Sequence, residues 1–185
     1  MTTPTTPTTP APQRQPVCLT VGRLEVRFDW RDDRWGHRFF IDGRAVWESV
    51  EGASAAPPLS DRWPASPVFT EIMMTETAAG PALLAVGRAG RSHFSASLTA
   101  AANTADTLLA EIACRLQEAP DWLGSSYRPL CHEADERPAG GQLSIQPPPA
   151  GSNLPATSNW SYRVGVSGFT AVSPASCEQP ADQSD

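Results

Sequence analysis

The feature that most constrains the fold is the strict alternation of apolar and polar residues in LEVRFDWR, residues 24–31. Leu24, Val26, Phe28 and Trp30 share one face of an extended chain, and charged residues occupy the other face. A period of two residues is typical of a strand that buries one face. We therefore expect an antiparallel sheet as the framework of this protein.

Short turns and further strand-like segments follow. Asp32-Asp33 separates the first strand from RWGHRFFI, and Asp42-Gly43 separates that segment from RAVWESV. Asp-Gly is a strong hairpin signal because glycine accepts a positive φ. Beyond a Pro-rich loop, VFTEIMMTE, ALLAVGR and SHFSASLT predict three more strands.

The segment NTADTLLAEIACRLQEAP, residues 103–120, predicts a helix. Its apolar residues recur at helical spacing, Thr104 can cap the start, and Pro120 ends the segment. The predicted apolar stripe consists of Leu108, Leu109, Ile112, Ala113 and Leu116. The expected fold is mainly β (α+β): an antiparallel meander of about six strands, forming a partly open barrel or half-barrel, closed by one C-terminal amphipathic helix.

Composition divides the 185 residues into a core and two ends, because most of the 19 prolines lie near the termini. Residues 1–16 repeat Thr-Thr-Pro and predict a disordered leader. Residues 17–132 are expected to form the single globular domain. Residues 133–185 are expected to be mostly disordered, with a strand possible at 159–172.

Charge and cysteine content exclude several classes of function. The net charge is -6, and an acidic chain is a poor candidate for nucleic-acid binding. All 14 basic residues are arginine, whose planar guanidinium groups suit stacking and carboxylate pairing. No run approaches the ~20 apolar residues of a membrane span, and the N-terminus lacks the apolar core of a secretory signal. The expected location is therefore cytoplasmic. The four cysteines form no C-x-x-C pair, and although CHEADE (131–136) groups metal-binding side chains, we expect neither a metal site nor a cofactor.

His37 is the residue whose chemistry most needs explaining. If Asp32-Asp33 is a two-residue turn, Phe28 lies opposite His37, which then faces the apolar side. If Asp42-Gly43 is also a two-residue turn, Glu48 lies opposite His37 from the third strand. Such a pair could act as a general base or as a polar contact in a ligand cavity; a purely structural role for His37 is the simpler interpretation. The residues of this candidate pocket are His37, Glu48, Trp35 and Phe28.

A candidate contact surface lies on and beside the opposite face of the hairpin. Six arginines between residues 23 and 44 are interleaved with acids, which indicates a ladder of solvated ion pairs; anion binding at the Asp32-Asp33 turn is an alternative. Tryptophans near the Pro-rich loop could contact a protein or a carbohydrate. The residues expected to form this surface are Trp63, Trp47, Arg27 and Arg38.

Taken together, these patterns favour a soluble binding or accessory domain that contacts other proteins, without identifiable catalysis. One alternative is a small-ligand pocket, or an enzyme of minor activity, built around an inward-facing His37–Glu48 pair. Another is a homo-oligomeric structural or assembly protein that pairs through an open sheet edge.

Overall fold

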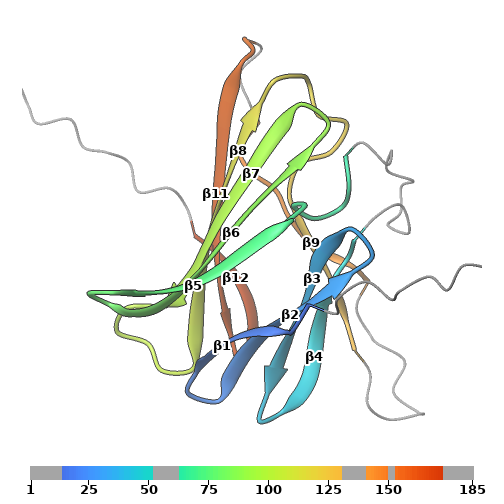
Figure 1. Ribbon diagram of the computed structural model, residues 1–185. Helices are drawn as coiled ribbons and strands as arrows, with labels where there is room; N and C mark the ends of the chain where they lie inside the picture. Colours follow the sequence, from blue (N-terminus) through green and yellow to red (C-terminus); the bar gives the residue numbers. More distant parts are fainter. Residues whose placement is uncertain (1–13, 52–62, 131–140, 150–152, 173–185) are drawn as a thin grey trace, which may run out of the picture.

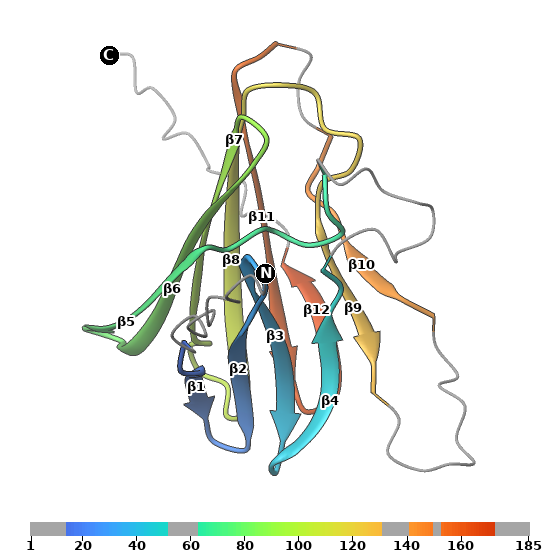
Figure 2. The same cartoon turned by 45° about the vertical axis from the view of Figure 1, so that its right-hand side comes forward.

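The computed structural model describes residues 14–51, 63–130, 141–149 and 153–172, which form two antiparallel sheets of six strands each (Figures 1 and 2). The first sheet contains, in spatial order, β1 (Val17–Val21), β2 (Leu24–Arg31), β3 (Arg34–Ile41), β4 (Arg44–Ser49), β9 (Ser125–Pro129) and β10 (Leu143–Ile145). The second contains β12 (Gly168–Val172), β11 (Ala156–Gly165), β8 (Thr107–Leu116), β7 (Ser92–Ala100), β6 (Gly80–Ala89) and β5 (Glu71–Thr77). None of the described segments is a helix that could cross a membrane.

The two sheets bury their inner faces in one shared core. The first sheet contributes Val26, Phe28 and Phe39, and the second contributes Leu83, Leu108 and other alternate residues of its strands. Each of these five side chains is fully buried, as period-two patterning requires. The mainly β, antiparallel character is thus confirmed, but the strands form two sheets that do not close into a barrel.

The predicted helix is wrong. Residues Thr107–Leu116 form strand β8, which lies between β7 and β11 in the middle of the second sheet. Its buried residues alternate strictly: Leu108, Ala110, Ile112, Cys114 and Leu116. Three of these five also belong to the helical stripe, so the sequence was compatible with both periods. Pairing with β7 and β11 on its two sides stabilises the extended conformation of this segment.

The first hairpin has the predicted register, whereas the second does not. β2 and β3 pair with Phe28 opposite His37, as a two-residue turn at Asp32-Asp33 requires. β3 and β4 begin in the expected register after Asp42-Gly43, but a β-bulge between Phe39 and Phe40 shifts the pairing by one residue.

The fold continues past the expected domain boundary at residue 132. The segment at 159–172, where one strand was considered possible, lies within a hairpin of β11 and β12, and all ten residues of β11 pair with β8. β10 also lies beyond residue 132. Of the predicted leader at 1–16, residues 1–13 lie outside the described residues.

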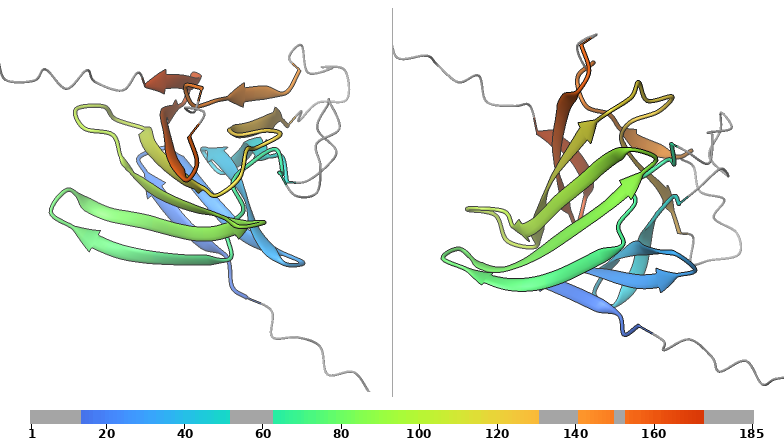
Figure 3. Two further views of the ribbon diagram at one scale, coloured as in Figure 1. Left: turned by 90° about the horizontal axis from the view of Figure 1, so that it is seen from above. Right: turned by 45° about the horizontal axis from the view of Figure 1, so that its top comes forward.

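The segment before β5 connects the two sheets on their inner side. The amide of Trp35 in β3 donates to the carbonyl of Phe69, and the amide of Thr70 donates to the carbonyl of Val86 in β6. Gly87 allows this close approach, because a Cβ there would lie 2.0 Å from the Val68 carbonyl oxygen. The turn that follows β5 projects away from the first sheet (Figures 1 and 3).

Candidate functional site

His37 lies in the core, where aromatic rings surround it. Its ring stacks on Phe28 at 4.7 Å between centroids, and its Nε2 lies 3.0 Å from the hydroxyl of Tyr127. That hydroxyl in turn hydrogen-bonds the hydroxyl of Tyr162 in β11. The residue is only 5% exposed, so burial lowers its pKa to about 3, with the nearby Arg31 charge acting in the same direction. The imidazole is therefore neutral near neutral pH.

The cavity beside His37 is too small for a substrate. Its volume is about 10 Å³, which is roughly the space that one water molecule occupies. The Nδ1 atom of His37 is buried and has no hydrogen-bond partner among the described protein groups. The predicted residue Trp35 is buried as well, packed edge-to-face on Trp30. The interior around His37 is thus filled by side chains.

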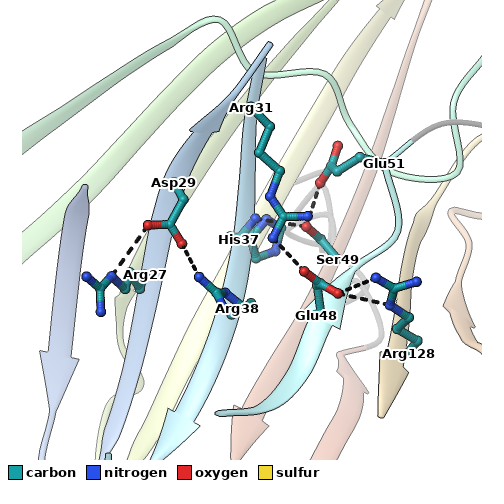
Figure 4. A network of polar contacts seen from close by, with 9 residues as sticks. All are labelled: Arg27, Asp29, Arg31, His37, Arg38, Glu48, Ser49, Glu51 and Arg128. Atoms are coloured by element: carbon teal, nitrogen blue, oxygen red, sulfur yellow. Dashed lines mark hydrogen bonds and ion pairs between the residues drawn. The ribbon is translucent and has the colours of Figure 1, made fainter. Parts of the chain in front are cut away.

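The structure does not bring Glu48 to His37. The bulge in the second hairpin places Glu48 opposite Arg38, and its carboxylate lies on the outer face of the first sheet (Figure 4). There it accepts hydrogen bonds from Arg31 at 2.5 Å and from Arg128 at 2.5 and 2.9 Å. Burial raises the pKa of Glu48, but these two guanidinium groups outweigh it, and the pKa lies below its ordinary value.

A second carboxylate, Glu51, lies near this network. The hydroxyl of Ser49 donates to Glu51 at 2.5 Å and accepts the His37 backbone amide at 2.9 Å. Burial raises the pKa of Glu51 to about 7, against the lowering effects of Ser49 and of the nearby arginines. Gly36 leaves room here, because a Cβ would lie 3.2 Å from the Arg31 side chain and 3.3 Å from that of Glu51.

The predicted contact surface is not assembled as expected. Trp63 is 1% exposed, so it belongs to the core and cannot offer a surface. Trp47 is half-buried and packs edge-to-face on Phe169. Only the two arginines lie on the outer face, where Asp29 pairs with Arg27 at 3.5 Å and with Arg38 at 2.7 Å. This face is a ladder of ion pairs (Figure 4).

A larger hollow than the one at His37 lies on the second sheet. It is a groove of about 810 Å³, which we name the seam groove because it begins where the edges of the two sheets meet. One wall is the segment 145–148, which follows β10, and the other residues come from the second sheet. The sheet residues that line it are Leu84, Ser95, Ala96, Ser97, Glu111, Ile112, Ala113, Asn159, Trp160, Ser161, Ala171 and Val172.

Strand register explains how these residues come together. Ser97 pairs with Glu111, and Glu111 pairs with Ser161, so the three form one row across β7, β8 and β11. The next row contains Ala113 and Asn159. Alternation places these rows on the outer face, where most side chains are small. The floor of the groove is therefore shallow and mostly uncharged, with one carboxylate.

The edge of β11 is partly unpaired at the groove. β12 pairs only with Ser161–Gly165, so residues 156–160 have no described strand beside them on that side. Asn159 and Trp160 belong to this stretch and line the groove. The Trp160 indole is itself anchored, because its Nε1 donates to Ser125 Oγ at 3.0 Å. Within the described part of the chain, no strand uses the main-chain donors and acceptors on this side of the stretch.

Sequence reasoning missed the seam groove. The strand-like segment NWSYRVGVSGFTAV was the one local indication of it. This segment pairs with β8, and because a helix is predicted there, the sequence does not predict a sheet face common to both. The CHEADE segment at 131–136 lies outside the described residues. Among the residues that the structure describes, no three histidine, cysteine or acidic side chains are grouped to hold a metal ion.

Comparison with known proteins found no match to this chain among family models, curated proteins or solved structures.

Proposed function

We propose that the protein is a binding domain that takes an extended segment of a partner protein into the seam groove. The observation that carries the proposal is the stretch 156–160 of β11, which has no strand of the described residues on one side and contributes Asn159 and Trp160 to a groove of about 810 Å³. An extended segment can add to such an edge as a further strand, with main-chain hydrogen bonds supplying affinity.

The lining of the groove fits such a ligand. Serine and alanine at the floor, as at Ser95 and Ala113, let a polypeptide backbone approach the sheet closely. Glu111, Gln146 and Asn159 supply polar groups that can select side chains of the bound segment. The volume lies within the range of ~300–1,000 Å³ that is usual for ligand sites.

The interior gives less support to a small-ligand pocket. The cavity at His37 holds about 10 Å³, and the polar partner expected there, Glu48, faces outward. A general base also needs access to a substrate and a pKa near the working pH. A buried imidazole with a pKa of about 3 meets neither condition.

The experiment is a selection of phage-displayed dodecapeptides on the immobilised full chain, followed by calorimetry with the synthesised peptides. Asn159→Trp fills the groove, whereas Arg163→Trp changes an exposed residue on the same strand and the same face, outside the groove. We expect Asn159→Trp to weaken binding by about tenfold or more, a loss of roughly 1.4 kcal/mol. Arg163→Trp should change the affinity less than about twofold.

Two outcomes would overturn the proposal: no peptide is enriched, or Asn159→Trp binds the enriched peptides as tightly as the native chain does. Hydrogen exchange provides a second readout, because a peptide added to β11 should protect amides between 156 and 160. Sedimentation at two concentrations tests the homo-oligomer alternative, in which a second copy of this chain supplies the added strand.

A further inference from the structure

Three side chains that can be positively charged lie side by side on the outer face of the second sheet. Arg88 in β6 pairs with His93 in β7, and His93 pairs with Arg115 in β8. All three are exposed. We name them the arginine row. They line a second hollow, of about 610 Å³, together with Thr70 and Thr157.

The arginine row has no counter-charge in the described part of the chain. Neither Arg88 nor Arg115 forms an ion pair there, whereas Arg31, Arg38 and Arg128 of the first sheet are all paired with carboxylates. Arg88 and Arg115 lie on either side of His93, and their two positive charges repel each other. An unneutralised row in a chain of net charge -6 therefore points to a ligand that supplies the negative charge.

The acidic residues nearest to the arginine row along the strands of this sheet do not pair with its arginines. Glu71 pairs with Val86, two residues before Arg88, and makes no ion pair with it. Glu111 lies four residues before Arg115 on β8, and it accepts a hydrogen bond from Ser97 at 3.3 Å. Neither Glu71 nor Glu111 lines the hollow beside His93.

The geometry suits a carboxylate. Neighbouring strands lie ~4.8 Å apart, so Arg88 and Arg115 begin about 10 Å apart on either side of His93, and their long side chains can converge on one group. Arg115 is already oriented, because its Nη1 donates to Thr157 Oγ1 at 3.2 Å. Guanidinium groups bind carboxylates through two parallel hydrogen bonds.

This hollow is continuous with the seam groove. Ser95 and Ala113 line both hollows, so a side chain of a segment in the seam groove can extend towards the arginine row. We propose that Arg88, His93 and Arg115 bind a carboxylate side chain of the partner segment, which makes the partner an acidic polypeptide. The identity of the partner rests on the proposed function; the anion site rests on the row alone.

The experiment is an NMR titration of the ¹⁵N-labelled full chain with four probes: hexaglutamate, hexaglutamine, acetate and inorganic phosphate. The test variant is Arg88→Gln/Arg115→Gln. The control, Arg91→Gln/Arg163→Gln, removes the same charge from exposed arginines that line neither hollow. We expect hexaglutamate to shift signals of the row, with affinity about tenfold weaker in the test variant and changed less than about twofold in the control. Hexaglutamine should have no effect.

If both variants bind hexaglutamate equally weakly, binding depends on net charge alone and the proposed site is wrong. The proposed site is also wrong if hexaglutamate shifts no signals of the arginine row. Tighter binding of phosphate than of hexaglutamate would overturn the assignment to a carboxylate. The two proposals fail separately. If hexaglutamate binds the arginine row but no selected peptide depends on Asn159, the anion site is supported and the proposed groove function is wrong. If selected peptides depend on Asn159 but hexaglutamate does not bind the row, the groove function is supported and the acidic partner is wrong.

Discussion

At the scale of single residues, His37 is explained by burial. It lies between Phe28 and the Tyr127 hydroxyl, and removal of its imidazole from water disfavours the charged form. A histidine held neutral in this way contributes a polar contact between the two sheets, since Tyr127 continues the hydrogen bonding to Tyr162. The residue that most attracted a catalytic interpretation is thus part of the packing.

This environment predicts how stability depends on pH. The native pKa of His37 is about 3 and the pKa of an unfolded histidine is about 6.5. Between these pH values the unfolded chain binds a proton at this residue and the native state does not. The free energy of unfolding should therefore fall as the pH drops from about 6.5 towards 3, by up to about 1.4 kcal/mol per pH unit from this group. Above about pH 6.5 the group adds no pH dependence.

The variant His37→Gln should be less stable than the native chain at pH 7, and the difference should shrink at lower pH because glutamine does not titrate. Urea denaturation of both chains at about pH 7, 5.5 and 4.5 measures this difference. Taking the difference between the chains cancels the contribution of Glu51, whose raised pKa acts in the opposite direction. A difference that stays constant with pH would contradict a buried neutral His37.

At the scale of secondary structure, β8 shows how two periods can coexist in one segment. Leu108, Ile112 and Leu116 are spaced by four residues, which satisfies a helical face and a strand face alike. The alanines distinguish the two: Ala110 is 1% exposed, whereas Ala113 faces outward into the seam groove. A helical stripe would have buried Ala113.

Substitution of glutamate at each of these two alanines tests whether residues 107–116 form a strand. Ala110→Glu should cost about 3 kcal/mol or more, because it places an unpaired carboxylate in the core. Ala113→Glu should change the stability by less than about 1 kcal/mol. Thermal unfolding of both variants measures the contrast, and a larger loss for Ala113→Glu would mean that the segment is helical.

At the scale of the whole molecule, aromatic contacts connect the two sheets. Phe169 of β12 stacks on Tyr127 of β9 at 4.5 Å between centroids and packs edge-to-face on Phe39 and Trp47. Among the strands that the structure describes, no hydrogen-bonded pair joins the two sheets beside these contacts. Side-chain packing therefore holds the seam together.

Removal of the Phe169 ring should loosen this junction. Because the residue is half-buried, Phe169→Ala should cost about 2 kcal/mol, somewhat below the loss at a fully buried phenylalanine. Val166→Ala, at the exposed turn between β11 and β12, is the matched control and should cost less than about 0.5 kcal/mol. Chemical denaturation gives both values; equal losses would show that Phe169 does not join the sheets.

The sequence by itself determined the antiparallel, mainly β character and the pairing of β2 with β3, because alternation and a two-residue turn are local signals that read directly as strand and register. Only the tertiary structure decided three other features. One bulge turned Glu48 outward, the flanking strands made residues 107–116 a strand, and the pairing of β11 with β8 created the seam groove. Each of these features depends on which distant segments pair with one another. The pattern of hydrophobic residues within one segment does not specify its partner strands.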